Sequence, residues 1–231
     1  MNTQINITEN GTTTLATAGK YCDRNIDVKV DVPAQPVSYA SFLDGTISGE
    51  FVDDKVTALK TAVFQNCVNL TYISLPNCVE AANGSTFNGC EKVQTLDLPK
   101  LASLTGTASR VFYGMKKLKE INLPELVTAP NMSLTFSQCT DVERILLPKL
   151  GGTSLTQTFY NCYRLHTLVL GGSTLNTLAN TNAFTNVGTN AEYAPNGISI
   201  YVPDDMVNTY KTATNWTAYA DKIKPMSELE G

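Results

Sequence analysis

The stretch AVFQNCVNLTYISLP (residues 62–76) recurs four more times along this chain without gaps. The further copies are STFNGCEKVQTLDLP (85–99), RVFYGMKKLKEINLP (110–124), LTFSQCTDVERILLP (134–148) and QTFYNCYRLHTLVLG (157–171). Their phenylalanines are 23, 25, 24 and 23 residues apart, and 25 residues later Phe184 begins a degenerate sixth unit. Such a period predicts a repeat architecture in which stacked units bury one continuous core.

Each position of the unit, counted from its phenylalanine, has its own chemistry. Positions +9 and +11 are apolar and flank one outward residue, which is the period-two pattern of a short strand. Proline at +12 ends that strand in four units, because it has no N–H for the ladder, and Gly171 takes its place in the fifth. Position +2 predicts a left-handed turn residue. Its occupants are Asn66, Gly89, Gly114, Gln138, Asn161 and Asn186.

The pattern F-x-x-C-x-x-L-x-x-I-x-L-P resembles the BspA-like class of leucine-rich repeats over residues 62–203. This resemblance implies an α/β-type, β-rich, right-handed solenoid with a parallel sheet on one face. It implies no reaction. We therefore expect four segments. They are a small N-terminal β module with a linker (1–35), an N-terminal cap (36–61), five repeats (62–182), and a degenerate sixth repeat with a strand-helix cap (183–231).

The N-terminal segment has its own signals. Asn10-Gly11 predicts a turn, the alternation over residues 26–32 predicts a half-buried strand, and Pro33–Pro36 predicts a stiff linker. The segment resembles a small β module found before such repeats in gut-bacterial and prophage proteins of tail or surface type. The cap is expected to cover the open end of the core through Phe42, Phe51, Val56 and Leu59.

The C-terminal segment is predicted to close the other end. Residues 197–203 form the expected last strand, preceded by a surface excursion near residues 189–195. Asp204 or Asp205 is the expected N-cap of a helical lid. Apolar spacing continues that helix to Ile223, and Trp216 is expected to pack within the cap.

Composition limits the classes of function. The 231 residues carry a net charge of -4, and only 16% are charged, while Thr (30) and Asn (20) supply most of the polarity. The chain lacks the basic footprint of a nucleic-acid binder, and it has no apolar run long enough to span a membrane. Met1 begins no visible signal peptide. No phosphate loop, dinucleotide fingerprint or EF-hand loop occurs, so no cofactor is expected.

The six cysteines predict core packing rather than a metal or disulfide set. Cys67, Cys90, Cys139 and Cys162 share position +3, and Cys78 stands at an apolar position, whereas no C-x-x-C pair occurs. Cysteine is small and apolar enough for a tight core site, and neighbours in a ladder point in parallel, which disfavours bridging. Cys22 lies outside the repeats.

The outward face of the predicted sheet is the candidate binding face. Outward positions +8 and +10 line up across strands about 4.8 Å apart. The candidate residues, with His166 from position +7, are Tyr72, Ser74, Thr95, Asp97, Glu120, Asn122, Arg144 and His166.

A glycosidase is the enzymatic alternative for this face. The spacing of neighbouring strands would allow Asp97 and Glu120 to lie within the separation of about 5–9 Å that such carboxylates require. However, Arg144 follows Glu120 in its column and favours a cross-strand ion pair, and a smooth face offers no deep cleft. His166, the only histidine, has no accompanying nucleophile motif and is expected to be exposed.

We therefore expect a non-catalytic recognition or adhesion module that binds a protein or glycan through this face. A structural component of a phage tail-like particle, self-associating through the N-terminal module, is the second hypothesis, and an enzyme is the third. The resemblance suggests an extracellular, cell-surface or virion location.

Overall fold

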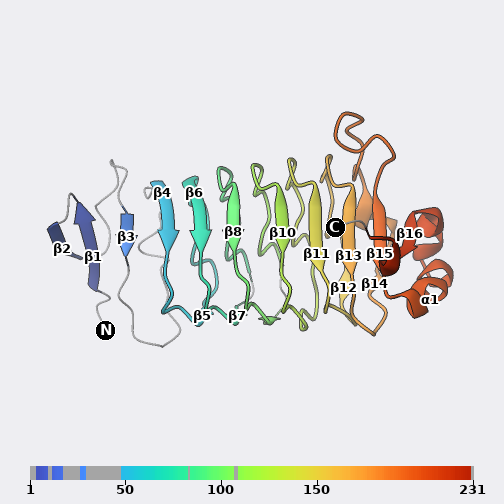
Figure 1. Ribbon diagram of the computed structural model, residues 1–231, viewed down its shortest axis with the longest axis horizontal. Coiled ribbons are helices and arrows are strands. Elements are labelled where there is room, and N and C mark those ends of the chain that lie inside the picture. Colours follow the sequence, from blue (N-terminus) through green and yellow to red (C-terminus); the bar gives the residue numbers. More distant parts are fainter. Residues whose placement is uncertain are drawn as a thin grey trace.

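The computed structural model describes residues 4–9, 12–17, 27–29, 48–82, 84–106 and 109–229, with side chains from residue 49 on. Within these ranges the chain winds as a solenoid whose strands succeed one another along a single long axis (Figure 1). Proline or glycine follows each central strand and sends the chain round to the next turn of the solenoid.

The main face is a series of parallel strands, one from each turn of the solenoid. The strands fall into two sheets that meet between β8 and β10. Their bounds are β4 (Ser48–Val52), β6 (Asn69–Ser74), β8 (Thr95–Asp97), β10 (Glu120–Asn122), β11 (Arg144–Leu147), β13 (Thr167–Leu170), β15 (Ser199–Val202) and β16 (Ile223–Pro225).

A second parallel ladder of two-residue strands runs along another side of the solenoid. These strands are too short to produce a period in the sequence, so the pattern did not predict them. They are β5 (Ala58–Leu59), β7 (Glu80–Ala81), β9 (Ser103–Leu104), β12 (Ser154–Leu155) and β14 (Thr177–Leu178). Single bridges from Ser103 to Thr128 and from Asn131 to Ser154 continue the ladder between β9 and β12.

Stacked phenylalanines form the centre of the core. Successive rings from Phe64 to Phe184 lie 5.3–5.9 Å apart between centroids and are tilted by only 7–23°. Phe51 closes the ladder edge-on at one end, and Trp216 closes it at the other. Burial of Phe51, Val56 and Leu59 agrees with their predicted place in the cap, whereas Phe42 lies outside the described residues.

Left-handed backbone recurs in every repeat at the predicted place. All six residues at position +2 have positive φ, between 57° and 78°. A second left-handed position, two residues before the phenylalanine, was missed, because its side chains share no chemistry. Its occupants are Ala62 (φ 58°), Ser85 (65°), Arg110 (56°), Leu134 (55°) and Gln157 (48°).

The cysteine prediction is confirmed for the five described thiols, which are free and buried. The thiols of Cys90, Cys139 and Cys162 donate to the phenylalanine carbonyl of the preceding repeat, at 3.0–3.1 Å. This column therefore links neighbouring repeats as well as filling space. Cys22 lies outside the described residues.

The fifth repeat has glycine where the others have proline because the chain approaches its neighbour closely there. A Cβ on Gly171 would lie 2.3 Å from the Pro148 carbonyl oxygen, and one on Gly172 would lie 2.4 Å from the Gly151 nitrogen. No larger residue fits these two positions without a backbone shift.

The N-terminal strands continue the main sheet. β1 (Gln4–Glu9) pairs antiparallel with β2 (Thr12–Thr17) and with β3 (Asp27–Lys29). β3 then pairs in parallel with β4, so this module and the solenoid share one sheet of order β2-β1-β3-β4-β6-β8. The predicted turn at Asn10-Gly11 and the predicted linker at Pro33–Pro36 lie outside the described residues.

The C-terminal cap differs from its prediction in three respects. The strand over residues 197–203 exists as β15, but it is not the last, because β16 pairs with it in parallel. The predicted helix to Ile223 is instead the short helix α1 (Val207–Thr212) followed by the 3₁₀ segment η3 (Trp216–Lys222), and Ile223 begins β16. The other 3₁₀ segments are η1 (Thr181–Phe184), η2 (Asp204–Met206) and η4 (Met226–Glu228).

Neither aspartate caps a helix. Pro203 precedes η2 and Met206 precedes α1, and neither residue caps through its side chain. The Asp204 carboxylate accepts from the Ser227 backbone N–H at 3.1 Å and thereby ties η4 to η2. Hydrogen bonds from the Ser227 hydroxyl and backbone lower the pKa of Asp204 below its ordinary value.

Asn176, a buried residue of the fifth repeat, binds two aromatic residues of the cap. Its carbonyl accepts from the Trp216 indole at 2.7 Å, and its side-chain amide donates to the Tyr210 hydroxyl at 2.9 Å. The predicted packing role of Trp216 is confirmed, since its side chain is fully buried.

Candidate functional site

The outward face of the main sheet carries two rows of side chains that the core does not use. In the first sheet, strand register aligns Tyr72 with Thr95 and Ser74 with Asp97. In the second, it aligns Glu120, Arg144 and Thr167 in one row and Asn122, Leu146 and Val169 in the other. The repeat period places the two sets at equivalent positions, so they form two rows along the face. Seven of the eight candidate residues lie in these rows. His166 lies one residue before β13, at the edge of the face.

The N-terminal half of the face is polar. The Ser74 hydroxyl donates to the Asp97 carboxylate at 2.7 Å, across the pair β6–β8. Ser74 is thereby only 5% exposed, although its strand position is outward. Thr95 is exposed, and Tyr72 is half-buried. A partner would meet Asp97 and Tyr72 here rather than Ser74.

The predicted cross-strand ion pair is present at the centre of the face. Arg144 Nε lies 3.4 Å from Glu120 Oε2, across the pair β10–β11. The two atoms attract electrostatically but form no hydrogen bond. Arg144 Nε is buried without a hydrogen-bond partner. Asn122 is exposed beside this pair.

The two carboxylates proposed for glycoside hydrolysis thus have separate partners. Asp97 is bound by Ser74, and Glu120 faces Arg144 with 45% of its side chain exposed. A general acid needs a desolvated carboxyl that is free to reach its substrate, whereas both carboxylates here are already engaged by neighbouring side chains on an open face. The arrangement suits recognition by charge better than acid catalysis.

His166 is only partly exposed, in contrast to its prediction. Its Nδ1 lies 2.9 Å from the hydroxyl of the next residue, Thr167. Among the described residues, the His166 ring forms no hydrogen bond to a carboxylate. Within the same ranges, no group of three or more His, Cys, Asp or Glu side chains is placed to hold a metal ion.

An apolar strip occupies the C-terminal half of the face. Leu146, Val169 and Tyr201 are direct neighbours across β11, β13 and β15. Val169 is only 2% exposed, while Leu146 and Tyr201 are half-buried. Lys224 follows in the same row on β16, with its Nζ 5.8 Å from the Tyr201 ring centroid. The sequence did not predict Tyr201 as a face residue, because the excursion lengthens the sixth unit and moves its strand out of the repeat numbering. It did not predict Lys224, because β16 was not expected.

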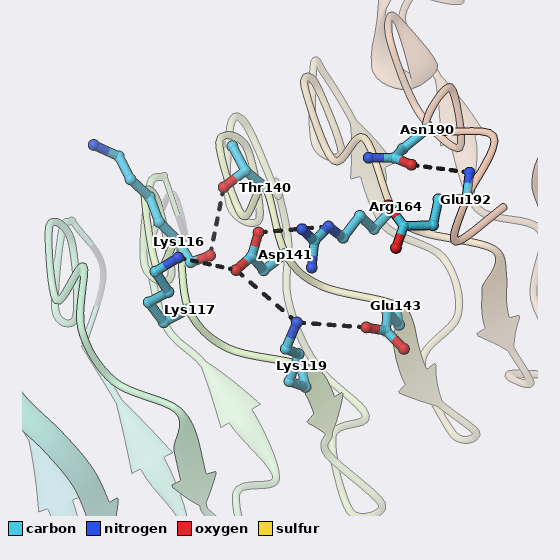
Figure 2. Close-up of polar contacts among 9 residues, drawn as sticks. All are labelled: Lys116, Lys117, Lys119, Thr140, Asp141, Glu143, Arg164, Asn190 and Glu192. Atoms are coloured by element: carbon cyan, nitrogen blue, oxygen red, sulfur yellow. Dashed lines mark hydrogen bonds and ion pairs between the residues drawn. The ribbon is translucent and has the colours of Figure 1, made fainter.

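A charged cluster borders the face at the turns that lead into β10, β11 and β13. Figure 2 shows Asp141 among cations from the repeats on either side. Its carboxylate, whose side chain is 15% exposed, lies 3.3 Å from Lys117 Nζ, 3.9 Å from Lys119 Nζ and 3.6 Å from Arg164 Nε. Lys119 also lies 3.5 Å from Glu143. This network links three successive repeats.

The predicted surface excursion folds back onto this cluster. The Tyr193 ring stacks on the Arg164 guanidinium at 3.8 Å, and Lys119 Nζ lies 5.8 Å from the same ring. A backbone bond from Asn190 N to Tyr163 O, at 2.9 Å, fixes the start of the loop. The excursion is therefore attached to the turns that lead into β10 and β13.

Comparison with known proteins identifies the repeats. The sequence model described as "BspA type Leucine rich repeat region" matches six copies over residues 54–190, which is more than half of the chain. No curated protein matches. A solved structure titled "Crystal structure of T. pallidum Leucine Rich Repeat protein (TpLRR)" aligns with 17% identity over 89% of this chain and 92% of that chain, with a TM-score of 0.44. The described residues include no helix with the length and apolarity to cross a membrane.

Proposed function

Since the chain belongs to the BspA-type leucine-rich-repeat family, we propose that it is a non-catalytic recognition module that binds a protein through the outward face of its main sheet. Repeats of this kind suggest protein binding or adhesion, but fold alone does not fix a function, so the face must carry the argument.

The observation that supports this proposal most is the apolar strip. The fold requires apolar residues at inward and buried positions, which include Val169, and it requires none at the partly exposed outward positions of Leu146 and Tyr201. Grouped apolar and aromatic side chains with a polar rim are typical of interaction sites. Here the rim consists of Arg144, Lys224 and the charged cluster.

The test is selection of binders on matched variants. A displayed library of random peptides is panned on the wild type, on Leu146→Glu and on Val127→Glu, which adds the same charge at a 52% exposed site outside the two outward rows. We expect clones that bind the wild type and Val127→Glu and are lost on Leu146→Glu. Clones that bind all three proteins equally, or the absence of enriched clones, would contradict the proposal.

The module's location is proposed to be the outer surface of a bacterial cell or a virion, in keeping with the resemblance of its repeats and its N-terminal segment. Immunogold labelling of intact cells and particles tests this location. Label confined to the cytoplasm of sectioned cells would exclude it.

Assembly into a phage tail-like particle is the second candidate function. The observation that favours it is that β2 is the terminal strand of its sheet and pairs, among the described strands, only with β1. A free strand edge is a template for pairing with another copy. Sedimentation equilibrium should then show self-association that Thr14→Pro weakens. A monomer at all concentrations would exclude this candidate.

A further inference from the structure

The charged side chains on the outward face are acidic near the N-terminal end of the solenoid and basic near the C-terminal end. Over β4 to β8 the two rows contain the carboxylates of Glu50 and Asp97 and no cation. Over β11 to β16 they contain Arg144 and Lys224 and no carboxylate. The C-terminal half is thus cationic on a chain whose net charge is -4.

The two cations of this half are differently engaged. Arg144 faces Glu120 on its N-terminal side, at 3.4 Å. Lys224 lies over the Tyr201 ring and has no described carboxylate within ion-pair distance. Arg144 has further guanidinium donors, and Lys224 has three ammonium donors, so both can accept an anionic group from a partner.

The apolar strip lies between these cations. Leu146 follows Arg144 by two residues on the same face of β11, and Tyr201 is the direct neighbour of Lys224. A ligand residue seated on Leu146 and Tyr201 would therefore have a cation on each side. Aromatic and aliphatic anchors flanked by charge pairs are the usual centre of a protein interface.

The bordering cluster extends the same charge. Lys117, Lys119 and Arg164 converge on the single carboxylate of Asp141, and among the described residues Glu143 is the other acid paired with one of them (Figure 2). Three cations therefore share two carboxylates. Lys117 and Lys119 keep 62% and 52% of their side chains exposed, so their remaining ammonium donors face solvent.

From this juxtaposition we infer that the partner, if the proposed function holds, presents an acidic extended segment. Its apolar side chain lies on Leu146 and Tyr201, the two members of the strip that remain partly exposed, and its carboxylates pair with Arg144, Lys224 and the edge lysines. Complementary charge would speed encounter and set the orientation of the segment, while the apolar contact supplies most of the affinity.

Synthetic peptides test this inference directly. Three peptides of about ten residues share the same Leu and Tyr anchors. The residues between and around the anchors are Glu in the first peptide, Gln in the second and Lys in the third. Fluorescence anisotropy measures the binding of each peptide. We expect the Glu peptide to bind about tenfold tighter than the Gln peptide, and the Lys peptide to bind more weakly still. Raising the salt to about 0.5 M should abolish the difference, because salt screens exposed charges.

Matched charge reversals locate the effect. Lys224→Glu should remove the preference for the Glu peptide. Lys100→Glu, which changes the charge equally at a lysine that bonds Asn77 outside the two outward rows, should leave that preference intact. Equal binding of the Glu and Gln peptides, no binding of any peptide, or equal loss in both variants would overturn the inference.

The outcomes separate this inference from the proposed function. If panned clones depend on Leu146 but are not acidic, the face binds a partner and only the charge inference fails. If no clone depends on Leu146, both fail. Sedimentation velocity tests whether the partner is a second copy of this chain. A wild-type dimer that Lys224→Glu dissociates would show that the cationic half binds the acidic half of another copy, and it would overturn the inference of a separate acidic segment.

Discussion

The central repeats and the C-terminal cap are held together by different kinds of contact. From Phe64 to Phe159 one stacking contact and one backbone pattern recur in every turn. The cap has no such recurrence. Contacts that occur once attach it, among them the bonds to Asn176, the packing of Trp216 on Phe184 and the pairing of β16 with β15. The repeats therefore distribute stability over many equivalent positions, whereas the cap concentrates it in a few.

Removing one ring of the ladder should have the largest effect. Phe136→Ala deletes a fully buried side chain that stacks on both Phe112 and Phe159, and it should cost about 3–5 kcal/mol in the free energy of unfolding. Urea denaturation measures this loss. A loss under about 1 kcal/mol would show that the ladder is not the core.

Weakening the attachment of the cap should cost somewhat less. Asn176→Ala leaves the Thr153 N–H buried without its partner, at about 1–3 kcal/mol, and removes one of the two bonds to the Tyr210 hydroxyl, at about 1 kcal/mol, while the bond from the Asn176 backbone N–H remains. We therefore expect a total loss of about 2–4 kcal/mol. Trp216 fluorescence should change at lower urea than the circular dichroism of the repeats. Asn196→Ala, at an exposed position, is the control. If the two signals remained coincident in Asn176→Ala, the cap would not be a separable region.

A thiol of the repeat column should have an intermediate effect. Cys139→Ala removes the bond from the thiol to the Phe112 carbonyl and leaves a small cavity, so we expect a loss of about 1–2 kcal/mol by urea denaturation. Thr140→Ala, one residue away in the turn, is the control. An equal loss of unfolding free energy in both variants would show that the thiol makes no special contribution.

Alkaline pH tests the same thiols together. Burial raises the pKa of Cys78 and of Cys139 from 9.0 to about 12, and it raises that of Cys162 as well. Their protonated form is thus favoured in the folded chain, while the unfolded chain loses these protons near pH 9. The stabilisation is complete below pH 9 and is lost as the pH rises toward 12. Urea midpoints that stay constant from pH 8 to 10.5 would contradict this assignment.

The surface ion pair should have the smallest effect on stability. Glu120→Gln removes the partner of Arg144 at a position with 45% of its side chain exposed, and such pairs contribute about 0–1 kcal/mol. The same variant should tighten binding of the Glu peptide, because it releases Arg144. Anisotropy measures the second effect, and weaker binding would show that Glu120 itself contacts the ligand.

The repeats could be predicted from the sequence because each inward position is repeated in every turn. Position +2 shows this well, since its mixture of Asn, Gly and Gln predicted left-handed backbone that all six residues adopt. Position −2 adopts the same backbone with Ala, Ser, Arg, Leu and Gln, so its conformation is imposed by the stacked neighbours and leaves no trace in residue type.

The cap and part of the face could not be predicted because they depend on contacts that occur once. Asp204 has the chemistry of an N-cap, but Ser227, 23 residues later, takes its carboxylate. Lys224 lies on the face because β16 pairs with β15, and β16 lies outside the repeated sequence pattern. The outward residues of β6 and β8, and those of β10 and β11, were predicted because the same outward positions recur in each repeat and the strands of each pair are in register.

Side-chain footprinting tests the central claim most directly. Hydroxyl radicals modify accessible side chains, and the wild type is compared with and without a binder enriched by panning. The account predicts that modification of Leu146 and Tyr201 falls on binding, while modification of Val127 and Val79, exposed outside the outward rows, stays unchanged. Protection of Val127 and Val79 with Leu146 and Tyr201 unaffected would show that the partner binds elsewhere.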